Sequence, residues 1–138
     1  MALFLSWAVL WLSLYDPVGA YAMGPYWGAV TQESPIIRAG VRYAAWAQWG
    51  PEGRTIKIDW PWFEEHNASG VTARVEASCV LVHEAIHLRD ASSNHEKPLL
   101  YQYMCLSRLK APDWMIDRVY QQLAAMLPKP GAEEDNGD

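Results

Sequence analysis

Basic side chains are absent from the start of this 138-residue chain, because no lysine or arginine occurs before Arg38. Over the whole chain, acidic residues outnumber basic ones and the formal net charge is −5. A domain that binds nucleic acid carries a basic patch or stripe. The sequence shows none, so we expect no nucleic-acid partner.

A long apolar segment is also lacking. A transmembrane helix needs about 20 consecutive apolar residues, whereas the apolar run near the N-terminus, ALFLSWAVLWLSLY, has only fourteen. This length suits the core of a signal peptide, and Ala20–Ala22 offers small residues for cleavage. We interpret residues 1–22 as a signal peptide, which predicts an exported protein, periplasmic or secreted. An uncleaved anchor that associates with a membrane, and a buried first helix of a cytosolic domain, are the alternatives.

Cysteine is scarce, and the sequence contains no internal repeat and no domain linker. The two cysteines are Cys79 and Cys105. In an oxidising compartment such a pair suggests a disulfide, and in the cytosol it suggests two buried thiols; the sequence leaves both open. With 51% hydrophobic and 20% charged residues, the chain is expected to form one globular domain.

Hydrophobic periodicity predicts four helices and one strand. Apolar residues recur at helical spacing in the best of these helices, which is expected over residues 71–89. Ile56 and Ile58 alternate with Lys57 and Asp59, which predicts a half-exposed strand over residues 54–60. The other helices are expected over residues 36–49, 96–109 and 111–127. The polar, acidic end of the chain, residues 129–138, is expected to be a disordered tail.

The segment CVLVHEAIHLRD, residues 79–90, places two histidines and a glutamate in the middle of the best helix. His83 and His87 are one turn apart and project to the same side, so both rings can bind one metal ion. Zn²⁺ binds neutral imidazole nitrogens. Glu84 lies one residue round the helix, where it can act as the general base on a metal-activated water.

The His-Glu-x-x-His motif resembles the signature of the zincin metallopeptidases. The resemblance covers His83, Glu84 and His87 closely, and residues 54–109 more loosely. It implies that the two histidines bind zinc and that Glu84 is the catalytic base. It also implies that the strand at residues 54–59 lies at a sheet edge, where it binds extended peptide.

The third metal ligand depends on the branch of the family. The metzincin pattern fails, because Asp90 stands in place of its glycine and Ser93 in place of its third ligand. The gluzincin branch takes a glutamate from the following helix, and Glu96 fits that role. His95 and Asp90 are the alternatives for the third ligand.

The resulting hypothesis is a zinc-dependent metallopeptidase with a mostly helical α+β fold. Its zincin-like domain is expected over residues 23–128, with a short antiparallel sheet packed on the active-site helix and a following helix. The expected substrate is a peptide or protein, and Zn²⁺ is the expected cofactor. The competing hypothesis is a zincin-fold protein that binds a metal or a partner without turnover and is anchored to a membrane.

Overall fold

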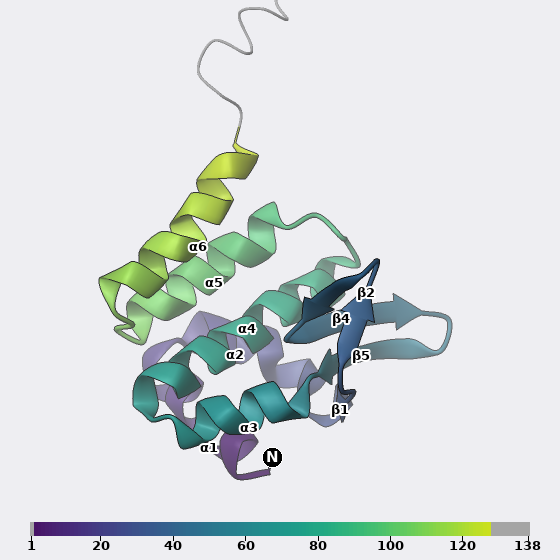
Figure 1. Ribbon diagram of the computed structural model, residues 1–138, viewed down its shortest axis with the longest axis horizontal. Coiled ribbons are helices and arrows are strands. Elements are labelled where there is room, and N and C mark those ends of the chain that lie inside the picture. Colours follow the sequence, from purple (N-terminus) through teal and green to yellow (C-terminus); the bar gives the residue numbers. More distant parts are fainter. Residues whose placement is uncertain (1, 128–138) are drawn as a thin grey trace, which may run out of the picture.

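The computed structural model describes residues 2–127 and has a mostly helical α+β fold, which confirms the predicted fold class (Figure 1). The expected acidic tail, residues 129–138, lies outside the described residues. In chain order the elements are α1 (Ala2–Tyr15), α2 (Pro17–Met23), the 3₁₀ helix η1 (Gly24–Ala29), β1 (Val30–Gln32), β2 (Ile36–Arg38), β3 (Val41–Tyr43), β4 (Ala45–Gly50), β5 (Gly53–Ile58), α3 (Trp60–Ala68), α4 (Val71–Asp90), α5 (Glu96–Arg108) and α6 (Asp113–Met126).

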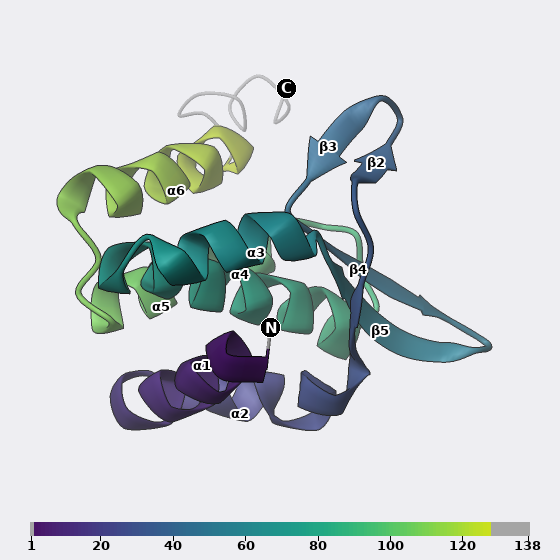
Figure 2. The same cartoon turned by 60° about the horizontal axis from the view of Figure 1, so that its bottom comes forward.

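Helix α4 is the centre of the molecule. It contacts α1, α2, α3 and α5 as well as β4 and β5, and Figure 2 shows α1 and α2 on one side of it with α6 on the opposite side. Its central turns are buried on almost every face, including those of Leu81, Ala85 and Leu88. A helix that is buried all round holds its polar side chains only where they have partners. The buried histidine and glutamate side chains of α4 are therefore expected to have such partners.

The sheet that packs on α4 is mixed rather than purely antiparallel. Its order is β1-β5-β4, with β1 parallel and β4 antiparallel to β5. The segment expected to be an edge strand, residues 54–59, falls mostly in β5, which is the central strand. That expectation is wrong, because β1 pairs with β5 from a distant part of the chain. The edge strand next to α4 is β4.

The helix expected over residues 36–49 is also wrong. This segment forms a hairpin of β2 and β3, followed by β4. Ala39 and Gly40 link the two hairpin strands, with φ angles of 51° and 77°. Two consecutive left-handed residues form the tight turn that suits a two-residue hairpin. Ile36, Ile37 and Val41 are β-branched, and they favour the strands on either side of that turn.

Helices α1 and α2 pack on the core. Phe4, Ala8 and Leu12 of α1 are fully buried, and the Phe4 ring meets the ring of Phe63 of α3 edge-on. Buried Asp16 accepts a hydrogen bond from Arg108 at the end of α5, with 2.9 Å between Oδ1 and Nη1. Residues 2–22 thus pack on the core through one face, with Leu3, Leu10 and Leu14 exposed on the other, while cleavage, export and the alternatives to them stay predictions. Within residues 2–127, the helices are too short or too polar to cross a bilayer.

A disulfide joins helices α4 and α5. Cys79 of α4 and Cys105 of α5 are bonded, with their Cα atoms 5.6 Å apart. The bond closes a loop with a sequence separation of 26, for which the chain-entropy model gives about 3–4 kcal/mol of stabilisation. Of the two interpretations that the sequence left open, the structure has the disulfide.

Candidate metal centre

Three histidines from two elements converge on one point. His83 and His87 lie on successive turns of α4, and His95 lies at the N-terminal end of α5. One ring nitrogen from each lies within 4.8 Å of the other two, which is close enough for all three to bind a single metal ion. His87 is buried, His83 is partly buried and His95 is exposed.

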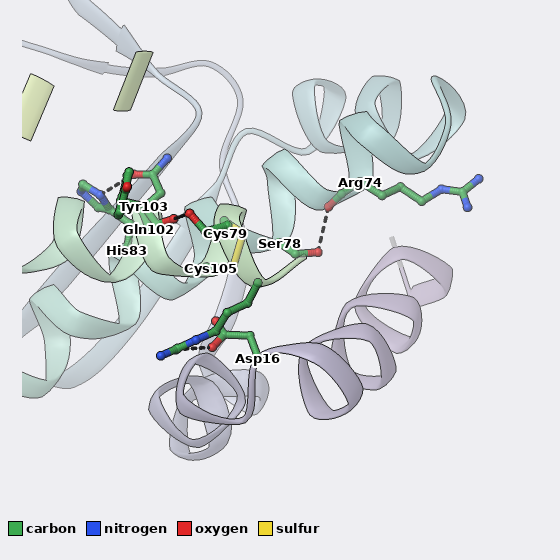
Figure 3. Close-up of a disulfide and its surroundings, with 10 residues drawn as sticks. Asp16, Arg74, Ser78, Cys79, His83, Gln102, Tyr103 and Cys105 are labelled. Atoms are coloured by element: carbon green, nitrogen blue, oxygen red, sulfur yellow. Dashed lines mark hydrogen bonds and ion pairs between the residues drawn. A yellow bond between two sulfur atoms is a disulfide. The ribbon is translucent and has the colours of Figure 1, made fainter. Parts of the chain in front are cut away.

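Hydrogen bonds on the far sides of two rings decide which nitrogens face the centre. Nδ1 of His87 donates to the carbonyl oxygen of Ser92 at 2.7 Å, because a carbonyl can only accept. Nδ1 of His83 is 2.8 Å from Oε1 of Gln102 and donates to it in the same way (Figure 3). The Nε2 atoms of both rings then carry lone pairs that point toward the common centre. A carbonyl or amide oxygen behind a ligating histidine is a usual feature of metal sites.

Two of the three distances between these nitrogens, those from His87, match the spacing around a small tetrahedral cation, and all three nitrogens lie within 4.8 Å of one another. Nε2 of His87 is 3.2 Å from Nε2 of His83 and 3.2 Å from Nδ1 of His95. Zinc binds imidazole nitrogen at about 2.0–2.1 Å, so two ligands at tetrahedral angles are about 3.3 Å apart. Two facing lone pairs repel each other unless a cation lies between them. The donor set and its spacing therefore fit a metal ion such as zinc.

Both α4 histidines are held in the neutral form that a metal requires. Burial and the neighbouring His87 and His95 together lower the pKa of His83 to about 3, although its hydrogen bond to Gln102 opposes the shift. Burial also lowers the pKa of His87, although its bond to Ser92 partly opposes this. Neutral rings at ordinary pH do not have to lose a proton before they bind a cation.

Glu96, which the sequence analysis favoured as third ligand, is not brought to this centre. Its backbone N–H donates to Oδ1 of Asn94 at 2.8 Å, and its side chain lines a separate depression together with Asp90. The loop after α4 turns back at Ala91, which has φ +46°. This turn brings the ring of His95, which precedes Glu96 by one residue, to face His87. The only sequence signal for His95 is that it is a third histidine shortly after the motif.

Glu84 lies in the same cleft as the three rings. The residue is 9% exposed, and its Oε2 accepts a hydrogen bond from the backbone N–H of Ala47 in β4 at 2.9 Å. Burial raises the pKa of Glu84 to about 8, although the bond from Ala47 opposes the shift. A cation bound at the three rings would lower this pKa toward neutrality. A carboxyl group with such a pKa can both accept and release a proton near neutral pH.

The cleft runs along an unpaired strand edge. It has a volume of about 570 Å³ and lies between β3, β4, α4, α5 and α6. Within the described residues, β4 pairs with β5 on one side and with no strand on the other. Because the N–H of Ala47 points to Glu84, the antiparallel alternation directs the backbone groups of Ala45 and Trp49 to the same open side. Trp46, Trp49 and Leu99 make the cleft wall largely apolar.

The arrangement joins a cluster of three histidines that could hold a metal ion, a buried carboxyl group and an open strand edge in one cleft. Two of the three predicted ligands, His83 and His87, meet there with the predicted base Glu84. His95 completes the cluster in place of Glu96. The chain matches no family model, no curated protein and no solved structure.

Proposed function

We propose that this protein is a zinc-dependent metallopeptidase, with His83, His87 and His95 as metal ligands and Glu84 as general base. The observation that carries the proposal is the convergence of three ring nitrogens within 4.8 Å of one another. Glu84 shares the cleft with them. Catalytic zinc sites commonly have three protein ligands and leave one position open.

The metal and the carboxyl group divide the chemistry between them. Zinc supplies, when bound, Lewis-acid activation of a water molecule and of the substrate carbonyl. Glu84 accepts the proton of the attacking water and then donates it to the leaving amine nitrogen. Glu84 directly follows His83 on α4. Because the helix backbone is rigid, the carboxyl group keeps a constant position relative to the proposed ligands. The apolar walls of the cleft strengthen these electrostatic interactions by excluding water.

The substrate class follows from the strand edge. An extended peptide can add to an exposed edge through main-chain hydrogen bonds. The open side of β4 at Ala45 and Trp49 offers such bonds next to Glu84. We therefore infer that the substrate binds as a peptide in extended conformation along β4.

Replacement of Glu84 tests the proposal. Glu84→Gln removes the base and no proposed ligand, so we expect full zinc content with hydrolysis reduced about 10²- to 10⁴-fold. The measurements are zinc content by elemental analysis and cleavage of a peptide library. Glu52→Gln makes the same chemical change at the exposed β4–β5 turn and should leave cleavage unchanged. Wild-type cleavage by Glu84→Gln would contradict the assignment.

Metal or partner binding without turnover is the second candidate. It is favoured by one observation, namely that the Glu84 carboxyl group is already bonded to Ala47 and buried. A wild-type protein that binds zinc tightly but cleaves nothing in the library would support this candidate over the peptidase.

A further inference from the structure

One disulfide and two side-chain contacts connect α4 to the helix end and body of α5, along the face of α4 that carries His83 and His87. The disulfide joins Cys79 to Cys105, the next turn of α4 joins His83 to Gln102, and the turn after that brings His87 to His95. Figure 3 shows the first two links side by side, with Gln102 pointing at the His83 ring. From one link to the next, the residue numbers rise along α4 and fall toward the start of α5, as expected for two neighbouring antiparallel helices.

We propose that Gln102 is a positioning residue for His83, and that the disulfide sets the spacing between α4 and α5 at which Gln102 reaches that ring. The affinity for metal is thereby coupled to the disulfide. This inference rests on the metal centre of the proposed function and not on peptide hydrolysis.

The role of Gln102 follows from the two nitrogens of His83. Oε1 of Gln102 accepts from Nδ1 at 2.8 Å, so the proton stays on that side and Nε2 keeps its lone pair for the metal. The bond also fixes the rotation of the ring. A partner of this kind is worth about 10- to 100-fold in metal affinity.

The role of the disulfide follows from its position. Cys79 precedes His83 by one helical turn, and Cys105 follows Gln102 by three residues. Each cysteine is therefore a same-face neighbour of one partner in the His83–Gln102 bond. Both cysteines are fully buried, so the link acts as a fixed spacer within the core. Without it, the distance between the helices depends on packing alone.

The first experiment removes the acceptor and keeps the length of the side chain. Gln102→Met should weaken zinc binding about 10- to 100-fold in chelator competition and alter the visible absorption of the cobalt-substituted protein. Gln102→Glu retains an acceptor oxygen and should restore affinity. In metal-free protein, ¹⁵N NMR should show the Nδ1–H form of His83 in wild type and its partial loss in Gln102→Met. Gln122→Met changes another glutamine of the same cleft and should alter neither property.

The second experiment tests the coupling. Cys79→Ala/Cys105→Ala should weaken zinc binding about tenfold in the wild-type background and much less in the Gln102→Met background, because both changes act on the same ring. If the double cysteine variant does not fold, the coupling is tested in the opposite direction on protein that keeps its disulfide. Because coupling is reciprocal, metal binding must then stabilise the disulfide. Saturating zinc should then slow reduction of the disulfide by a phosphine in wild type more than in Gln102→Met.

The outcomes separate this inference from the proposed function. Zinc binding that Gln102→Met leaves unchanged, or a cysteine effect that is the same in both backgrounds, overturns the inference. Zinc binding without peptide cleavage, together with the expected Gln102 effect, supports the inference and contradicts the peptidase. A wild-type protein that binds neither zinc nor cobalt overturns both.

Discussion

At the scale of single residues, the candidate for the third ligand depends on one position along the loop. His95 and Glu96 are neighbours in the chain, yet only the His95 ring faces His87. The hydrogen bond from Glu96 N–H to Asn94 fixes the start of α5, and the Glu96 side chain then leaves the cluster. Two of the residues that the sequence analysis named for the third ligand thus differ by one position along the chain, and His95 is the one that belongs to the cluster of three histidines.

Adjacent substitutions distinguish these two ligands. We expect His95→Ala to reduce zinc affinity strongly, because it removes one of three nitrogens, and Glu96→Ala to keep wild-type zinc content. Both changes occur at the same helix end, so helix destabilisation alone would affect them alike. Zinc content and chelator competition measure the difference. Loss of zinc in Glu96→Ala with retention in His95→Ala would restore the gluzincin ligand set.

The remaining histidine of the four, His66, lies away from the cleft and is expected to carry a charge. Nε2 is 2.9 Å from a Glu76 carboxylate oxygen, and Nδ1 is 2.8 Å from the Trp62 carbonyl oxygen. Both partners are acceptors, so both ring nitrogens donate. Burial alone would lower the pKa of His66, but the bonds to Glu76 and Trp62, with the charges of Glu76 and Glu65, raise it. The bond from His66 correspondingly lowers the pKa of Glu76, which Arg118 also contacts.

Stability should therefore depend on pH through His66. A raised pKa in the folded state means that the stabilisation is fully present below the unfolded value of 6.5 and is lost as pH rises through the folded value. His66→Phe keeps an aromatic ring on Trp62 and removes both bonds. We expect it to lower the free energy of unfolding by about 1 kcal/mol near pH 6 and by less near pH 9. Urea unfolding at both pH values measures this, and a pH-independent difference would contradict it.

At the scale of elements, the ends of α4 determine where His83, His87 and the His95 loop lie. Gly70 precedes the helix with φ +106° and ψ −175°, a backbone conformation that residues other than glycine rarely adopt. At the other end, Ala91 has a left-handed conformation, and its N–H bonds back to the last turn. These two turns place α4 between α3 and the His95 loop.

Substitution at Gly70 isolates this backbone requirement. A Cβ atom there would meet no neighbour within 4 Å, so Gly70→Ala changes only the conformational preference. We expect a loss of about 1–3 kcal/mol in the free energy of unfolding. Gly24 has equal space but a right-handed φ of −46°. Gly24→Ala should be neutral or stabilising by up to about 1 kcal/mol. Equal effects at both positions in denaturant unfolding would contradict this account.

At the scale of the whole molecule, the N-terminal helices are part of one core. Phe4 and Leu12 are fully buried against the rest of the domain, while Leu10 on the same helix is 56% exposed. The ion pair of buried Asp16 with the exposed Arg108 links this segment to the end of α5. A protein cleaved after residue 22 would lose these contacts and leave the Arg108 charge without this partner.

Two leucines of α1 test whether the segment belongs to the mature protein. In purified protein, Leu12→Ala should lower the free energy of unfolding by about 2–5 kcal/mol, and Leu10→Ala by less than about 0.5 kcal/mol. Intact mass gives the N-terminus of the same samples. If both variants unfold like wild type and the mass begins after residue 22, the segment is a leader that is removed.

Local sequence pattern was enough to predict the helical part of the candidate site. Side chains four residues apart on a helix share a face, so His83 and His87 meet wherever α4 lies, and Glu84 stays beside them. The same local periodicity correctly predicted β5, α4, α5 and α6. It did not predict the hairpin at residues 36–43, where the left-handed turn at Ala39 and Gly40 outweighed an apparent helical pattern.

The groups that surround these helical residues are brought there by tertiary packing, which the local pattern did not predict. His95, Gln102, the disulfide partner Cys105 and the open edge of β4 all reach α4 from elsewhere in the chain. Their positions depend on how a short loop turns and on which strand lies at the sheet edge. The packing of residues 2–22 depends likewise on a buried surface formed by distant elements. Local periodicity contains no information about such contacts, because they arise only when separate elements pack together.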